Sequence, residues 1–286
     1  MSPAANARSH TDTNIDTMRV VVTRPAAEAE TWCRQLRQEG FDAVALPLIA
    51  IGPLDEAGRA ALRSAWQSLA GQKVVMFVSA AAVQHFFDAS PPGMAWPAGT
   101  RAWATGPGTT AVLLRHGVPA GSIDSPPAGT ARLDSEALWA VAGERVQDGD
   151  PALIVRGAQR DQDDPSQAGH GRAWLADRLA RAGAVVTQLA AYRRGSPLWT
   201  SSEAASAAAL AGADTVWIFS NSEAIGHLFT LLAGVAPALC LGTAVTTHPR
   251  IADAARAAGF CRVEVAPAGL QGLAELLRRL QAGSGR

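Results

Sequence analysis

An internal repeat is the feature that most constrains how this chain can fold. The segment MFVSAAAVQHFF at 76–87 aligns with IFSNSEAIGHLF at 218–229, and GPGTTAVLLRHG at 106–117 aligns with HPRIADAARAAG at 248–259 at the same offset. The identical pairs are Phe77/Phe219, Ala82/Ala224, His85/His227, Phe87/Phe229, Pro107/Pro249 and Gly117/Gly259. Self-similarity of this kind indicates a repeated supersecondary unit, so we expect two similar lobes.

The upstream parts of the two copies align at other offsets. LRQEGFDAVAL at 36–46 matches LARAGAVVTQL at 179–189, and VVVTR at 20–24 matches ALIVR at 152–156. We attribute the change of offset to an insertion, DQDDPSQAGHG, at 161–171.

Short β-branched runs alternate with longer segments rich in Ala, Leu and Arg. The predicted strands include 18–24, 43–49 and 73–79, and the predicted helices include 27–40, about 55–70 and about 80–88. The first helix is expected to end at Gly40. This order is typical of parallel sheets covered by helices on both faces. The predicted fold class is therefore α/β, with two lobes that each contain a parallel sheet flanked by helices.

The charge balance excludes several kinds of partner. Lys plus Arg and Asp plus Glu both number 25, so no global positive field attracts nucleic acid or an anionic membrane.

Residues 1–17 are polar and are predicted to be a disordered extension, not an export signal. The stretch 224–249 has no charged residue, but its glycines, proline and histidines favour a helix, a turn and a buried strand over a membrane span. We expect a soluble, cytoplasmic protein.

The usual signatures of catalytic and metal sites are absent from the sequence. Cys33, Cys240 and Cys261 are odd in number and far apart, which excludes a disulfide framework and a C-x-x-C zinc site. Each is expected to be a small buried hydrophobic residue. There is no G-x-x-x-x-G-K-[ST] loop, no G-x-S-x-G elbow and no closely spaced metal-ligand cluster. Gly106-Pro107-Gly108 matches only part of a dinucleotide fingerprint.

Strand-to-helix turns that carry hydroxyls or amides remain as candidate binding groups. They are Thr23-Arg24-Pro25, Ser79, Thr105 with Thr109, Ser220-Asn221-Ser222 and Gly242-Thr243. In parallel α/β sheets such turns lie where ligands bind, and free N–H groups at helix N-termini accept anions. The alternative is that Ser79, Thr109 and Asn221 only cap their own helices. Two lobes with such turns across one cleft indicate a small polyanionic ligand.

Two histidines and one tyrosine allow more than one interpretation. His85 and His227 are equivalent in the repeat and lie mid-helix beside Phe and Leu, which favours packing over catalysis. Tyr192 is the one tyrosine of the chain, and it lies in LAAYRRG where the second copy's strand leaves its lobe. From position alone, a half-buried tyrosine at a strand end and a functional hydroxyl are equally supported.

Several segments, taken in order, resemble the uroporphyrinogen-III synthase family. They are VVVTRP, FVSAAAV, G-x-x-T from Gly106 to Thr109, VRG around Arg156 followed by GR and GAVV…YRR, FSNSEAI, and the closing Leu-rich AGLQGLAELLRRL. Together they cover residues 18–281, and their order and spacing are more specific than any one of them.

The resemblance implies a cytosolic lyase of tetrapyrrole (haem) biosynthesis. Members of the family convert hydroxymethylbilane to uroporphyrinogen III, with loss of water, ring closure and inversion of ring D through a spiro intermediate. They work as monomers, without metal or organic cofactor. The implied lobes are 18–47 plus 197–286 and 53–190, joined by extended connectors at 47–53 and 191–197 with a cleft between the lobes. The repeat alone would divide the chain near residue 150.

The implied site combines one hydroxyl donor with groups that hold the carboxylates of the bilane. Tyr192, at the hinge and facing the cleft, is the predicted acid or hydrogen-bond donor to the leaving hydroxyl. The predicted substrate-binding residues are Thr23, Arg24, Ser79, Gly106, Thr109, Arg156, Ser220, Asn221, Ser222 and Arg250. The chain has His248-Pro249-Arg250-Ile251 where the second lobe of the family often has G-x-x-T. Arg250 therefore either holds a carboxylate or lies in solvent.

Two other classes of protein remain open from the sequence. One is a non-catalytic two-lobed α/β protein that closes on a small polyanion. The other is a glycosyltransferase-like enzyme with two nucleotide-type lobes, although no ribose-binding carboxylate or phosphate loop is evident.

Overall fold

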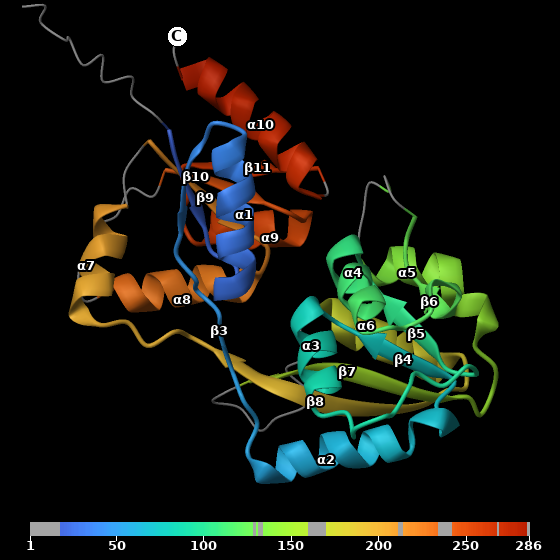
Figure 1. Cartoon of the computed structure of the whole chain (residues 1–286). Helices are drawn as coiled ribbons and strands as arrows, with labels where there is room; N and C mark the ends of the chain where they lie inside the picture. Colours follow the sequence, from blue (N-terminus) through green and yellow to red (C-terminus); the bar gives the residue numbers. More distant parts are fainter. Residues whose placement is uncertain are drawn as a thin grey trace, which may run out of the picture. The chain divides into compact units, whose positions relative to one another are not determined.

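The computed structural model describes residues 18–127, 130, 134–159, 170–210, 214–233, 242–267 and 269–284. Residues 1–17, most of the insertion at 161–171 and Cys240 lie outside this part. The described chain divides into two compact units (Figure 1). Unit 1 runs up to Leu48 and resumes with Leu198–Ala266 and from Ala274 onward, and unit 2 comprises Ile49–Pro197 with Pro267–Leu273.

Unit 1 is built on a five-stranded parallel sheet in the order β11-β10-β9-β1-β2. Its strands are β1 (Arg19–Val22), β2 (Asp42–Ala45), β9 (Thr215–Phe219), β10 (Thr243–Thr246) and β11 (Arg262–Val265). Its helices are α1 (Ala26–Gln38), α7 (Ser201–Ala209), α8 (Ser222–Leu232) and α9 (Pro249–Ala257), with α10 (Gly269–Ser284) from Ala274 onward. Val20, Val21 and Val22 of β1, an interior strand of this sheet, are fully buried, as expected where a parallel sheet is covered on both faces.

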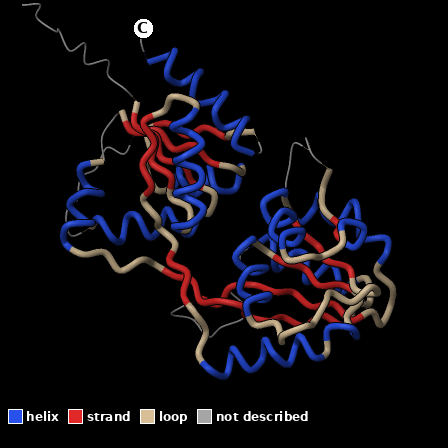
Figure 2. Tube along the Cα trace, in the orientation of Figure 1, coloured by secondary structure: helices blue, strands red, loops and turns tan. Residues whose placement is uncertain are grey.

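Unit 2 is built on a six-stranded sheet in the order β3-β8-β7-β4-β5-β6. Figure 2 shows the strands of this unit in red with its helices in blue around them. Its strands are β3 (Ala50–Gly52), β4 (Val74–Phe77), β5 (Arg101–Ala104), β6 (Ile123–Asp124), β7 (Pro151–Gln159) and β8 (Val185–Gly195). Its helices are α2 (Glu56–Gln67), α3 (Ala80–Asp88), α4 (Pro107–Arg115), α5 (Ser135–Ala142) and α6 (His170–Arg181), with short 3-10 turns at Leu69–Gly71, Ala120–Ser122 and Gly143–Arg145. The pairs are parallel except β3, which runs antiparallel to the end of β8.

The two faces of the unit 2 sheet carry separate cores, and alternation along β4 shows why. Val75 and Phe77 point to the face covered by α2, α3 and α4, where Trp66 stacks on Phe86 with ring centroids 4.9 Å apart. Val74 and Met76 point to the opposite face, where α5 and α6 contribute Leu138, Ala142, Leu175 and Leu179. The continuous apolar run of β4 is therefore explained by burial of both faces of the strand.

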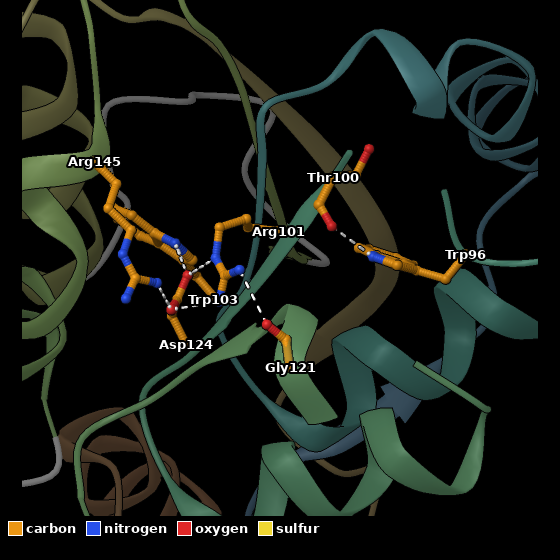
Figure 3. Close-up of polar contacts among 7 residues, drawn as sticks. All are labelled: Trp96, Thr100, Arg101, Trp103, Gly121, Asp124 and Arg145. Carbon is orange, nitrogen blue, oxygen red and sulfur yellow. Dashed lines mark hydrogen bonds and ion pairs between the residues drawn. The ribbon is translucent and has the colours of Figure 1, made fainter. Parts of the chain in front are cut away.

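A buried carboxylate stabilises the β6 edge of this sheet (Figure 3). Arg101 of β5 pairs with Asp124 of β6 through Nε and through Nη2, the latter at 2.7 Å, and Arg145 pairs with the same carboxylate. The Nε1–H of Trp103 donates to Asp124 at 3.0 Å. The hydrogen bond to Asp124 raises the pKa of Arg101 above its usual value. Because the Asp124 side chain is only 4% exposed, these donors are what make its burial possible.

The structure confirms the α/β class and its parallel sheets, and it refines the expected connectors. The segment expected at 47–53 contains β3, and that at 191–197 contains the end of β8; these two strands pair with each other. Asp55, which caps α2, also pairs with Arg193 at 3.0 Å. The stretch 224–249 forms α8 and β10 where it is described, and the described residues include no helix long and apolar enough to cross a membrane.

Candidate active site

Tyr192 and Ser79 lie together at the carboxyl edge of the unit 2 sheet. Ser79 follows β4 and caps α3, its Oγ accepting the N–H of Ala82 at 3.1 Å. The hydroxyl of Tyr192 lies 3.1 Å from the same Oγ, and either hydroxyl can be the donor. Only 3% of Tyr192 is exposed. The tyrosine is therefore a buried residue within β8. A half-buried tyrosine at a strand end was one of the two interpretations that its position in the sequence allowed, and its burial does not fit that interpretation.

A β-bulge explains why the tyrosine lies on this face. Along β7 and β8 the register pairs Arg156 with Ala190 but Gly157 with Tyr192, so Ala191 is the extra residue. Without the bulge Tyr192 would oppose Ala158, which by alternation belongs to the α5–α6 face. The bulge brings it onto the face of α3 instead. Bulges commonly re-aim a side chain in this way beside active sites.

Gly157 gives the ring its space. A Cβ added there would lie 2.6 Å from Cε2, 2.7 Å from Cζ and 3.0 Å from the hydroxyl oxygen of Tyr192. His85 of α3 stacks on the same ring, with centroids 5.5 Å apart and planes inclined by 28°. The sequence favoured packing for His85, and the structure shows that its packing partner is the candidate catalytic tyrosine.

The N-terminus of α4 presents backbone N–H groups without a side-chain cap. Gly106 is the N-cap residue and makes no side-chain bond, and Pro107 at the first position has no N–H. Only 7% of Thr109 is exposed, and its side chain does not cap the helix, which contradicts the capping interpretation. The nearby hydroxyl of Thr110 donates to the Gly106 carbonyl at 3.2 Å. Such a helix end can accept a carboxylate.

The side chain of Arg156 lies on the opposite face of the unit 2 sheet from Tyr192. This residue follows Val155 in β7, and alternation places it on the α5–α6 face, opposite to Val155 and Gly157. It is half-buried, and within the described residues its guanidinium has no hydrogen bond or ion pair.

In unit 1 the predicted residues also gather at the carboxyl edge of the sheet. Thr23 follows β1, is 1% exposed, and donates its hydroxyl to the carbonyl of Ile218 in β9 at 2.7 Å. Asn221 follows β9 and caps α8 by accepting the N–H of Glu223 at 2.8 Å, as the capping interpretation proposed. Ser220 is half-buried and Ser222 is exposed on either side of it. Because β1 and β9 are neighbours, these groups share one edge.

Both candidate arginines of unit 1 lie near the starts of helices. Arg24 pairs with Glu28 at 2.8 Å and stacks over Trp32, with its Cζ 3.8 Å from the ring centroid. Arg250 is exposed at the start of α9, where its backbone N–H donates to the Nδ1 of His248 at 3.1 Å. His248 therefore caps this helix at the position where the family often has G-x-x-T.

The second repeat histidine has a different role from the first. His227 of α8 lies 2.7 Å through Nδ1 from the carbonyl of Leu48, and its Nε2 is 3.8 Å from Glu223. This contact connects α8 to the point where the chain leaves unit 1. The repeated residues are thus equivalent in sequence but have different partners.

The cysteines fall into two environments. Cys33 is fully buried, and its burial raises the pKa of the thiol to about 11. Cys261 is exposed, which corrects the expectation that every cysteine is buried. Among the described residues no group of three or more His, Cys, Asp or Glu side chains is placed to hold a metal ion.

Two α/β units, each with hydroxyls and helix N-termini at the carboxyl edge of its sheet, define a protein suited to a small anionic ligand. The sequence matches the family described as Uroporphyrinogen-III synthase HemD over residues 30–274. Since this match spans most of the chain, the chain belongs to that family. The comparisons support a synthase, and none favours a non-catalytic anion-binding protein.

Solved structures share the fold at low sequence identity. A variant uroporphyrinogen III synthase from Thermus thermophilus is 19% identical with a TM-score of 0.54, and the match covers 93% of this chain and 100% of that one. Uroporphyrinogen-III synthetase from Helicobacter pylori is 14% identical with a TM-score of 0.51, over 92% and 100% of the two chains. Both are similar in architecture to the two-unit fold described above.

Proposed function

We propose that this chain converts hydroxymethylbilane to uroporphyrinogen III with loss of water and inversion of ring D, and that Tyr192 is its proton donor. The observation that carries the proposal is the pairing of Tyr192 with Ser79 at the carboxyl edge of the unit 2 sheet. The chain contains one tyrosine, and the bulge in β8 turns it onto the face of α3.

The hydrogen bonds around Ser79 suggest how the phenol is prepared for donation. The Ser79 oxygen already accepts from Ala82, so its own proton can be donated to the oxygen of Tyr192. The phenol proton is then left for the leaving hydroxyl of the bilane. A chain of this kind polarises each member and stabilises the negative charge that develops on the phenol oxygen as its proton leaves.

The proposed reaction needs few other groups. The methylene C–O bond breaks as Tyr192 supplies a proton, water leaves, and a pyrrole-stabilised cation remains. The substituted carbon of the last ring attacks this cation, giving the spiro intermediate, which opens and recloses with that ring inverted. Loss of one proton from the closed macrocycle restores the phenol. Most of the enzyme's contribution is geometric, because the same cation closes to the symmetric isomer in water.

The carboxylates of the bilane are assigned to the two sheet edges. The N-termini of α1 and α4 have no side-chain cap bond, whereas those of α3, α8 and α9 are capped by Ser79, Asn221 and His248. We therefore assign carboxylates first to the α1 and α4 ends, beside Thr23 and Thr109. Each such contact contributes about 0.3–1 kcal/mol, and more where it is partly buried.

The isomer of the product tests the proposal. The purified protein is mixed with hydroxymethylbilane made by an enzyme in the same tube, and the oxidised porphyrins are separated by isomer. We expect the type III isomer with the native protein and the type I isomer with heat-denatured protein. Type I isomer alone from both samples would reject the proposed function.

We also propose that the enzyme acts as a cytoplasmic monomer without metal or organic cofactor. The support is its family and its balanced charge, which gives no general attraction to nucleic acid or anionic membranes. Size-exclusion chromatography with light scattering at several protein concentrations tests the oligomeric state.

A further inference from the structure

The phenol ring of Tyr192 is fixed by three contacts, and the proposed mechanism uses only one of them. Its hydroxyl meets Ser79, the backbone of Gly157 lies against the ring, and the half-buried imidazole of His85 stacks on the ring. Gly157 belongs to the sheet and His85 to the helix that covers this face. The ring is therefore packed between strand and helix.

We infer that His85 is a positioning residue for Tyr192. Ser79 caps α3 and His85 lies within it, so a single helix sets both the hydrogen bond of the phenol and the orientation of its ring. The catalytic consequence of the inference rests on the proposed function, but the placement of the ring does not. His85 touches the phenol ring through stacking and transfers no proton in this assignment.

The expected loss of rate when the His85 imidazole is removed can be estimated from the interaction energy of a stacked ring pair. Gly157 has no side chain that could compensate, so loss of the imidazole leaves the ring free to tilt toward α3. A stacking interaction of ordinary strength corresponds to about a two- to twelvefold change in rate if it is lost only from the reactive orientation. Substrate affinity should change little, because the carboxylate-binding groups remain.

The experiment compares four proteins: wild type, His85→Ala, His85→Phe and His116→Ala. His85→Phe keeps an aromatic stack but cannot exchange a proton. His116→Ala is the matched control, since His116 also stacks on an aromatic ring of unit 2, that of Phe87, at 4.6 Å and 22°. Activity is measured as kcat and KM for type III isomer formation. Tyrosine labelled with ¹³C at Cζ gives one NMR resonance, because the chain has one tyrosine.

If His85 positions Tyr192, the variants should differ in rate and in the tyrosine resonance as follows. His85→Ala lowers kcat about two- to twelvefold with KM within about twofold, and its tyrosine resonance moves or broadens. His85→Phe restores both the rate and the resonance, and His116→Ala alters neither. An unchanged resonance in His85→Ala overturns the inference, as does a His85→Phe rate no higher than that of His85→Ala.

Two further arms keep the test decisive. If melting shows that His85→Ala does not fold, His85→Gln replaces it, since Gln is also a good helix former and lacks a ring. The NMR measurement needs no turnover. If wild type makes only the type I isomer, the proposed function fails, while the resonance still supports or overturns the positioning of Tyr192 by His85.

Discussion

At the scale of single residues, Tyr192 permits a substitution that separates chemistry from stability. Tyr192→Phe removes one hydroxyl and keeps the ring between Gly157 and His85. We expect most of the turnover to be lost, because the proposed proton donor is gone. The free energy of unfolding should fall by only about 1 kcal/mol, the usual net value of one hydrogen bond. A variant that keeps more than about half of the wild-type rate would show that another group supplies the proton.

Cys33 predicts a dependence of stability on alkaline pH. Burial raises its pKa from 9.0 to about 11, so the thiol in the folded protein stays protonated when the unfolded thiol ionises. Its contribution is therefore complete below pH 9 and is lost as the pH rises from 9 to 11. We expect the difference in unfolding free energy between wild type and Cys33→Ala to shrink by on the order of 2 kcal/mol over that range.

Denaturant titrations of both proteins across this pH range measure the effect. Cys261→Ala serves as the control, because Cys261 is exposed. A difference between wild type and Cys33→Ala that does not change with pH would contradict the prediction.

At the scale of elements, substitutions at the N-terminus of α4 can distinguish a role in substrate binding from a role in helix capping. Because Gly106 is the N-cap residue, Thr109→Ala removes a hydroxyl without removing a cap. We expect KM for the bilane to rise about three- to tenfold, and stability to fall by about 1 kcal/mol because the buried side chain also loses its methyl group. Thr110→Ala is the control, since its hydroxyl bonds to the Gly106 carbonyl and should affect stability alone. Equal KM values for wild type and Thr109→Ala would remove Thr109 from the site.

The β6 edge depends on the carboxylate of Asp124. Asp124→Asn leaves Arg101 and Arg145 without their anion, and we expect a loss of about 2–4 kcal/mol. This is less than for a fully buried pair, because Arg145 is half exposed. Asp253→Asn disrupts the exposed pair with Arg256 and should stay within about 0.5 kcal/mol. Chemical denaturation of the three proteins measures the difference, and equal losses in both variants would show that burial is not decisive here.

The elements that could be predicted from sequence are those whose pattern is local. Continuous apolar runs predicted β1 and β4 because both faces of these strands are buried, and Gly40, at φ 88°, ends the first helical segment as expected. The bulge at Ala191 could not be predicted, because it depends on which residues of β7 lie opposite. The face occupied by Tyr192, and hence its meeting with Ser79 and His85, therefore emerges only from the sheet register.

At the scale of the whole molecule, we expect substrate-dependent closure. The main chain passes between the units at Leu48–Ile49, at Pro197–Leu198 and on either side of Pro267–Leu273. The groups assigned to carboxylates lie in both units. A ligand that binds both sets should draw the units together, as in hinge closure. Small-angle scattering should then show a smaller radius of gyration when uroporphyrinogen III is added. An unchanged profile at saturating ligand would contradict closure.

The interrupted course of unit 1 also has a consequence for synthesis on the ribosome. The end of β1 bonds to a partner at the end of β9 that lies 195 positions later, whereas Ile49–Pro197 of unit 2 is continuous. At ordinary elongation rates β1 therefore waits roughly 10–40 seconds for β9, while unit 2 can already fold. During that interval one side of an apolar strand is open to pairing with other nascent chains. Translational pauses within unit 2 would lengthen this exposure. Slow translation of the unit 2 codons should therefore lower the yield of the intact enzyme.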